Sequence, residues 1–231
     1  MLSSAHCAGR SSNRKGNNPD TLVENGSTAT LPGNTLASVN LPEWTWFVGK
    51  GVSNALSGLS QMVGKELGVT SMDLKWTPAS KLIDILDIPD NITGIYLTIE
   101  GDTTGHMLLL HDTKIALQLV DRQLGLPKGS TQVLDEMEYS ILGEMGNITS
   151  SFFLNALADM TNLVLMPSPP SVLNDTAGAV VTVPLTLIME EYENVFVIRT
   201  TFKAEDDDIK GTFIVLIAMD FMTVLLDHIK K

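Results

Sequence analysis

The sequence predicts an α+β fold made of two similar halves that share one core. Short stretches recur along the chain: Asn-Ala-Leu at 155–157 follows the same tripeptide at 54–56 by 101 residues, and Leu-Leu-Asp at 225–227 follows Leu-Val-Asp at 119–121 by 106 residues. Helical and alternating apolar patterns also follow one another in the same order in both parts of the chain. Such a repeat predicts two equivalent sets of helices and antiparallel strands.

The first half, about residues 41–130, is expected to begin with a long helix. Met72, Leu74 and Trp76 then alternate with polar residues, which indicates a strand. The rest of this half predicts a short helix, a two-stranded hairpin and a closing helix, at 80–86, at 94–100 with 105–111, and at 113–124.

The second half, about residues 131–231, repeats this order. Its long helix carries apolar residues at three- and four-residue steps, and we expect them to face the core: Met137, Ile141, Met145, Ile148 and Phe152. The remaining elements are a helix at about 175–181 with Asp175 as its N-cap, strands at 195–202 and 211–218, and a closing helix at 221–229.

The acidic run at 205–208 lies between the last two expected strands. The two repeat offsets differ by five residues, and we place this insertion in the acidic run, which we expect to form a solvated hairpin tip.

Residues 1–40 differ in composition from the rest of the chain. They are rich in Ser, Asn, Gly and Thr, and their few apolar residues have no helical or strand periodicity. Such a segment buries too little apolar area to offset the entropy of ordering it. We therefore expect a disordered tail at 1–40 and one folded domain at 41–231.

Charge and composition exclude several classes of protein. The formal net charge of −12 disfavours binding to nucleic acid. The longest apolar run, 213–219, is too short for a membrane-spanning helix, and the single cysteine, Cys7, excludes an internal disulfide framework. We expect a cytoplasmic protein that does not insert into membranes.

A polar stripe on the second long helix is the strongest candidate for a functional site. Ser140, Glu144, Asn147 and Ser151 follow one another at steps of four, three and four residues, so they project from one face of the helix. A carboxylate on this face can pair with a lysine of a partner, and a carboxamide can hold a water molecule for attack.

The stripe lies within a longer pattern, in which Asn147 is followed by Ile148 and then by Asn-Ala-Leu at 155–157. This pattern resembles the signature helix of the CheC, CheX and FliY phosphatases of bacterial and archaeal chemotaxis. The resemblance continues through Pro169-Pro170 and the segments 175–179 and 195–198, where it is closest to CheC. It covers about residues 41–231 and implies a CheC-like fold.

The resemblance implies a phosphatase of the two-component signalling system of chemotaxis. The substrate would be the aspartyl phosphate of a CheY-type response regulator, which carries its own magnesium ion, so that no cofactor is expected on this chain. Asn147 would orient the attacking water in line with the phosphorus, and Glu144 would pair with a lysine of the regulator. Ser140, Ser151 and Asp175 would contact the partner. An amide suits this task because it adds no negative charge beside the phosphate.

The first half departs from the family pattern. At the offset of 101 residues, Glu43 matches Glu144, but Trp46 takes the place of Asn147 and Val39 that of Ser140. An indole cannot replace a carboxamide, because it donates one hydrogen bond and accepts none. We therefore expect a degenerate first site. Trp44 and Trp46 are either aromatic anchors of the core or part of an interaction surface.

A second function stays open, that of a non-catalytic adaptor that binds a response regulator or the receptor deamidase CheD, which CheC-type proteins bind. The segment 173–184 resembles the CheC helix used for that contact. The histidines His106, His111 and His228 lack further ligands near them in the sequence, so we expect no metal site. Because both halves are present in one chain, we expect a monomer.

Overall fold

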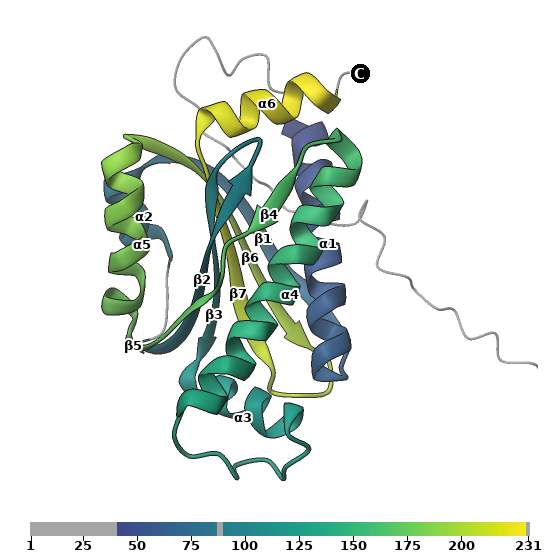
Figure 1. The fold of residues 1–231 in the computed structure, drawn as a ribbon, viewed down its shortest axis with the longest axis vertical. Helices are drawn as coiled ribbons and strands as arrows, with labels where there is room; N and C mark the ends of the chain where they lie inside the picture. The colour runs from purple at the N-terminus through teal and green to yellow at the C-terminus, as the bar shows by residue number, and fades with distance from the viewer. Residues whose placement is uncertain (1–40, 87–89, 230–231) are drawn as a thin grey trace, which may run out of the picture.

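The computed structural model describes residues 41–86 and 90–229, which form one seven-stranded sheet with helices on both faces (Figure 1). The strand order is β1-β6-β7-β3-β2-β4, and β5 also pairs with β2. All pairs are antiparallel, which agrees with the predicted α+β class. The expected tail at 1–40 lies outside the described residues.

The predicted elements form in the expected order, but the second half also contains β4 and β5, where no strand was expected, and α5 is longer than the expected helix at about 175–181. The first half consists of α1 (Leu41–Val63), β1 (Leu67–Pro78), the 3₁₀ turn η3 (Ala79–Lys81), α2 (Leu82–Leu86), β2 (Asn91–Gly101), β3 (Gly105–Asp112) and α3 (Thr113–Gln123). The second half consists of α4 (Glu136–Thr161), β4 (Leu165–Pro167), β5 (Ser171–Thr176), α5 (Ala177–Glu191), β6 (Asn194–Ala204), β7 (Lys210–Ile217) and α6 (Met219–Ile229).

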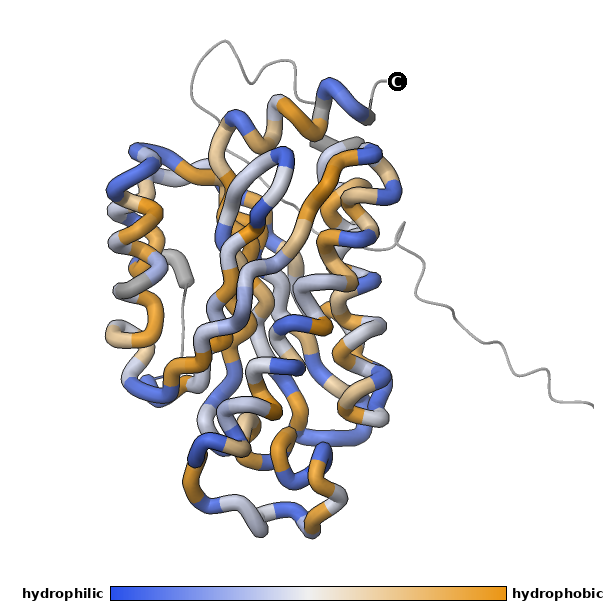
Figure 2. Tube along the Cα trace, in the orientation of Figure 1, coloured by the Kyte–Doolittle hydropathy of each residue, from blue (hydrophilic) through white to orange (hydrophobic). Residues whose placement is uncertain are grey.

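The apolar side chains form a cluster on each face of the sheet. The larger cluster lies between the sheet and the long helices α1 and α4, and includes Trp44, Phe153 and Phe213. The smaller one lies beneath α2 and α5 and includes Leu82 and Ile188. Figure 2 shows the apolar stretches along the strands and along the inner sides of the helices. Among the described residues, none of the helices is both long and apolar enough to cross a membrane.

The two halves are related by a pseudo-two-fold axis between β3 and β7. In this central ladder Leu110 pairs with Thr212 and His106 with Leu216, so exchanging residues that lie 106 apart maps the ladder onto itself. The axis also relates the β1·β6 pair to the β5·β2 pair. The internal repeat therefore corresponds to a symmetry of the sheet, and each half pairs its strands with strands of the other.

The strand registers correct the alignment of the two long helices. Leu67 pairs with Ala204, and the equivalent Leu165, which lies 98 residues after Leu67, pairs with Gly101. An offset of 98 residues, rather than 101, thus relates the segments that follow α1 and α4. Applied to the helices, it places Trp46 at the position of Glu144 and Gly49 at that of Asn147. Burial agrees, because Trp46 and Glu144 are both exposed.

Three local predictions are wrong in detail. Thr176, not Asp175, caps α5, because its hydroxyl accepts a hydrogen bond from the Ala179 N–H. The buried face of α4 lies about one residue away from the predicted one, so that Met145 is buried but Ile148 is only half-buried. Met137, which was expected in the core, is 55% exposed. As a result, β5 continues to Thr176, and α5 begins at Ala177 rather than at about residue 175 as expected.

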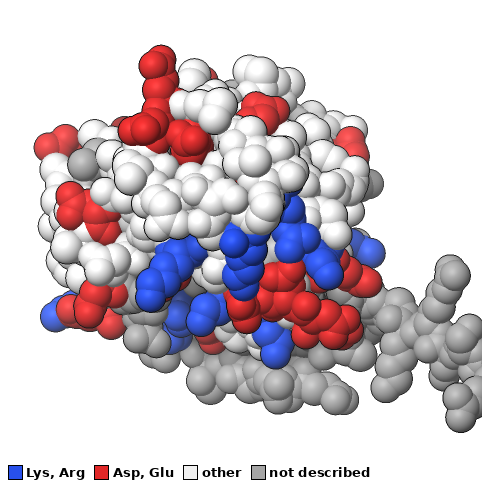
Figure 3. All heavy atoms as spheres, turned by 90° about the horizontal axis from the view of Figure 1, so that it is seen from below, with Lys and Arg blue, Asp and Glu red and all other residues white. Residues whose placement is uncertain are grey.

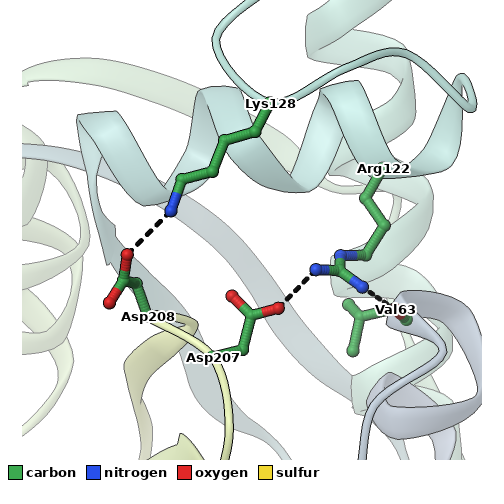
Figure 4. Close-up of polar contacts among 5 residues, drawn as sticks. All are labelled: Val63, Arg122, Lys128, Asp207 and Asp208. Carbon is green, nitrogen blue, oxygen red and sulfur yellow. Dashed lines mark hydrogen bonds and ion pairs between the residues drawn. The ribbon is translucent and has the colours of Figure 1, made fainter.

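The acidic run forms the expected hairpin tip between β6 and β7, with only Asp207 half-buried, and two of its carboxylates also form ion pairs. Asp207 pairs with Arg122, which also donates to the Val63 carbonyl, and Asp208 pairs with Lys128 at 2.7 Å (Figure 4). Seen from below, Lys and Arg side chains form a band beside Asp and Glu at this end of the molecule (Figure 3). The predicted place of the five-residue insertion is wrong in part, because the offset between the halves is 103 residues at Gly101 and Ala204 and becomes 106 in the β3·β7 ladder, so that only three extra residues lie in this hairpin. The ion pair of Asp207 with Arg122 nevertheless connects the second-half hairpin to α3 of the first half.

The connection between the halves is held by a buried carboxylate. Asp121 of α3 accepts hydrogen bonds from the backbone N–H groups of Gly129, Ser130 and Thr131, at 2.6, 3.1 and 2.7 Å. Burial alone would raise the pKa of Asp121, but the hydrogen bonds, led by those from Thr131, outweigh it and hold this pKa below its ordinary value. These bonds fix the loop that leads into α4.

The burial of His111 leads us to expect that the folded protein is less stable in mild acid than at neutral pH. The Nδ1–H of His111 donates to the Lys210 carbonyl at 3.0 Å, while Nε2 is buried and has no hydrogen-bond partner among residues 41–86 and 90–229. Burial lowers the pKa of His111 from 6.5 to about 4. Between these values the unfolded chain binds more protons, so the free energy of unfolding decreases as the pH falls. This residue should account for about 2 kcal/mol between pH 7.5 and pH 5.

Urea unfolding of the wild type and of His111→Gln over this pH range tests the prediction. Glutamine keeps a donor for the Lys210 carbonyl but does not titrate. The variant should show a flatter dependence of the unfolding free energy on pH. Equal slopes in the two proteins would contradict the assignment of this acid sensitivity to His111.

Candidate functional site

The candidate site lies on α4, a helix of 26 residues with defined ends. At its start, the Glu138 carboxylate accepts a hydrogen bond from the Asp135 N–H at 3.0 Å, which is half of a capping box. At its end, Asn162 adopts the left-handed conformation with φ of 58°, and its N–H donates to the Ala158 carbonyl. A helix fixed at both ends can hold side chains in a defined relative geometry.

Two glycines let α4 lie very close to the sheet. A Cβ atom on Gly146 would lie 2.3 Å from Cγ2 of Ile95 in β2, and one on Gly143 would lie 3.3 Å from Pro170. Position 146 therefore needs a residue without a side chain, whereas a side chain at position 143 would require Pro170 to shift by a few tenths of an ångström. Because these glycines precede Glu144 and Asn147 directly, the contact with the sheet fixes the two candidate residues.

The four residues of the polar stripe lie along the side of α4 that points away from the core. Ser140 and Glu144 are exposed, whereas Asn147 and Ser151 are half-buried. Within the described residues, none of these side chains has a hydrogen-bond or ion-pair partner. The helical rise places Glu144 and Asn147 about 4.5 Å apart along the axis. A carboxylate and a carboxamide are thus available together for a partner.

The structure does not bring Asp175 to this stripe. Asp175 lies near the end of β5 and accepts a hydrogen bond from the Thr176 N–H. It lines a groove of about 490 Å³ together with Asp90, Asp112 and Asn174. A contact through Asp175 would therefore use a surface other than the outer side of α4.

Sequence reasoning missed an apolar side chain beside the stripe. Met137 lies one turn before Ser140 and was assigned to the core, yet it is exposed. Val133, in the loop before α4, is 65% exposed. Exposed apolar residues next to polar ones are typical of interaction surfaces. The sequence contains little indication of this exposure, because Met137 continues the apolar spacing of α4. It is exposed because it lies in the first turn of the helix, beyond the core.

The equivalent face of α1 has different chemistry. Trp46 is 44% exposed, and Lys50 Nζ lies 5.7 Å from the centroid of its ring. Trp44 is buried and stacks on Phe47, which confirms its interpretation as an aromatic anchor of the core. Trp46 is not buried in the core, and its part in an interaction surface stays a prediction. Glu43 belongs to α1. Whether the halves are aligned with an offset of 101 or of 98 residues, the residue of α1 that matches Asn147, Trp46 or Gly49, has no carboxamide.

In the described part of the chain, no three His, Cys, Asp or Glu side chains lie close enough together to hold a metal ion. His106 Nδ1 lies 2.7 Å from the Tyr96 hydroxyl, and burial lowers the pKa of His106. His111 packs edge-on against Phe202. These two histidines therefore contribute to packing and internal hydrogen bonding.

Comparisons with known proteins support the importance of α4. A family model described as CheC-like family matches residues 137–173, which contain the whole polar stripe. The chain is 31% identical over 156 residues to the CheY-P phosphatase CheC of Bacillus subtilis (strain 168). This alignment covers 65% of this chain and 74% of the Bacillus protein.

Solved structures show the same fold. FliY of Thermotoga maritima matches with a TM-score of 0.61 at 17% identity, covering 79% of this chain and 92% of that one. A CheC-like superfamily protein from Shewanella sp. PV-4 matches with a TM-score of 0.51 at 16% identity, covering 74% and 96%. Together with the sequence identity to the Bacillus protein over most of its length, this fold establishes that the chain belongs to the CheC-like family of chemotaxis proteins.

Proposed function

We propose that this protein hydrolyses the aspartyl phosphate of a CheY-type response regulator. The observation that carries the proposal is the pair Glu144 and Asn147, displayed without internal partners among the described residues on the outer side of a fixed helix. The name of the Bacillus relative, a CheY-P phosphatase, supports the choice of substrate. A convex helix face suits a protein substrate better than a small molecule, which needs a concave pocket.

In this proposal Asn147 holds a water molecule in line with the phosphorus. The amide can donate a hydrogen bond to the water or accept one from it, and it places no charge beside the phosphate. The regulator provides the phosphoryl group, its magnesium ion and a lysine, so this chain contributes mainly positioning. Ser140, Ser151 and the exposed Met137 border the contact.

The first experiment measures the loss of phosphate from a phosphorylated regulator with and without the full chain. The protein should shorten the lifetime of the phosphorylated regulator in proportion to its concentration and without being consumed. An unchanged lifetime with each regulator from the same cell would contradict the proposed activity.

Glu144 is proposed to bind the partner rather than to activate water. Glu144→Gln removes the charge that pairs with the lysine of the regulator but preserves the shape of the side chain. We expect the regulator concentration at half-maximal rate to rise about tenfold, with a smaller change in the maximal rate. Steady-state kinetics measure both quantities.

Asp159→Asn is the matched control for Glu144→Gln, because Asp159 is an exposed carboxylate farther along the same helix. It should leave both kinetic quantities close to the wild-type values. A Glu144→Gln protein that lost only maximal rate would assign this carboxylate to the chemical step.

A second candidate function is an adaptor that binds CheD. The observation that favours it is a set of exposed apolar side chains on α2 and α5: Ile83, Leu187 and Met189 are 54%, 44% and 52% exposed. Val181, by contrast, is buried and would disturb the core if replaced. Retained binding of CheD without phosphatase activity would favour the adaptor, and Leu187→Asp with Met189→Asp should abolish that binding.

A further inference from the structure

The two edges of the sheet are built differently. The strand β1 forms one edge and runs for 12 residues from Leu67 to Pro78. On the other edge, its pseudo-symmetric counterpart is broken into β4 and β5, with Pro167, Pro169 and Pro170 at the break. Proline has no N–H group and blocks the addition of another strand. Only the β1 edge is therefore long and continuous among the described residues.

Within the described residues, β6 is the only strand that pairs with β1. A β-bulge lies near its start, between Val69 and Ser71, and Pro78 ends it. The stretch 71–77 between these features is free of proline and glycine. An edge of this kind can accept another strand through backbone hydrogen bonds.

The sequence of this stretch is complementary to itself in the antiparallel direction. If two copies pair around Leu74, Asp73 of each copy lies opposite Lys75 of the other, and Met72 lies opposite Trp76. The flanking residues, Ser71 and Thr77, are opposite each other as well. Cross-strand pairs of opposite charge and of sulfur with an aromatic ring stabilise antiparallel strands.

The side chains lie on suitable faces for this pairing. Leu74 is buried in the larger apolar cluster, and Met72 and Trp76 pack against it from the same face of β1. Asp73 and Lys75 therefore belong to the opposite face, where Lys75 is exposed and Asp73 half-buried. Asp73 is in register with Arg199 of β6, yet no ion pair joins them in the described structure. The carboxylate is thus available to a second cation.

We propose that two copies of this chain associate through their β1 strands, in antiparallel register centred on Leu74, to form a continuous sheet across a two-fold axis. Such an interface is isologous, because each copy contributes the same residues. The earlier expectation of a monomer rested on the internal repeat, which completes the β3·β7 ladder but leaves the β1 edge open. The proposal is independent of the phosphatase activity.

Charge reversal gives a sharp test, because the pairing predicts which variants associate. In Asp73→Lys, lysines would face lysines across the axis, and in Lys75→Asp, aspartates would face aspartates. Each variant alone should dimerise at least tenfold more weakly than the wild type. An equimolar mixture of the two should restore association, since each lysine then faces an aspartate.

Sedimentation velocity of the full chain over a wide concentration range measures this association, and circular dichroism verifies that each variant is folded. Lys81→Asp and Asp84→Lys are the matched controls, because each reverses one charge of an exposed ion pair between η3 and α2. Neither should change the association, alone or mixed. A wild type that stays monomeric at all concentrations, a dimer that survives in Asp73→Lys, or a mixture that fails to associate would each overturn the proposal.

Discussion

Asn147→Ala should lose at least about 10²-fold in the rate at which the protein dephosphorylates its regulator. The proposed mechanism assigns this amide to a single water molecule, and Asn147 is the only carboxamide among the four residues of the stripe. Without it, the attacking water loses its orientation while the helix keeps its shape. Binding of the regulator should change little, because Glu144 and the border of the contact are retained. Phosphate release under single-turnover conditions measures the chemical step directly.

Asn155→Ala provides the matched control on the same helix. Asn155 is exposed and lies about two turns beyond Asn147, so the same substitution removes the same chemical group from the same scaffold. It should retain the wild-type rate, and both variants should unfold at similar urea concentrations. An Asn147→Ala protein as active as Asn155→Ala would show that another group positions the water.

Gly101→Ala should destabilise the fold by about 3 kcal/mol or more. Gly101 ends β2 with φ of +119°, and a Cβ atom there would lie 2.1 Å from the Val164 carbonyl oxygen. That oxygen accepts a hydrogen bond from the Asp102 N–H at 2.9 Å, and the Val164 N–H donates to the Asp102 carboxylate at 2.8 Å. The backbone is held from both sides and cannot move away. Urea unfolding measures the loss.

Gly64→Ala separates strain from collision. Gly64 has φ of +64°, but nothing lies within 4 Å of the position of its Cβ atom. Only the left-handed conformation opposes alanine at this position, which costs about 1 to 2 kcal/mol. A loss at Gly101 no larger than that at Gly64 would mean that the chain around Val164 adapts to the added methyl group.

The order of the elements followed from the sequence because their signals are local. The alternation of Met72, Leu74 and Trp76 predicted β1, and the helical spacing along 137–152 predicted α4, and both elements form. The face of α4 was less predictable. Gly146 and Thr149 are buried there, and residues without large apolar side chains give no hydrophobic signal for close contact.

The alignment of the halves failed for a related reason. The tripeptide Asn-Ala-Leu occurs in both long helices, but its two copies occupy different positions relative to the sheet. A shift of three residues is close to one helical turn, so it preserves the apolar face while changing which residue matches Asn147. The ion pairs of Asp207 and Asp208 were equally inaccessible, because their partners lie 85 and 80 residues away in the chain.

The exchange of strands between the halves has a consequence for biosynthesis. When synthesis has reached residue 130, β1 still lacks β6, its only neighbour among the described strands, and the β2·β3 hairpin still lacks β4, β5 and β7 on its two sides. We therefore expect that neither half folds stably without the other, and that a fragment cut at the junction has little stable structure. Assembly must wait for the last hairpin, a high contact order that favours slow folding and makes chaperones valuable to the nascent chain.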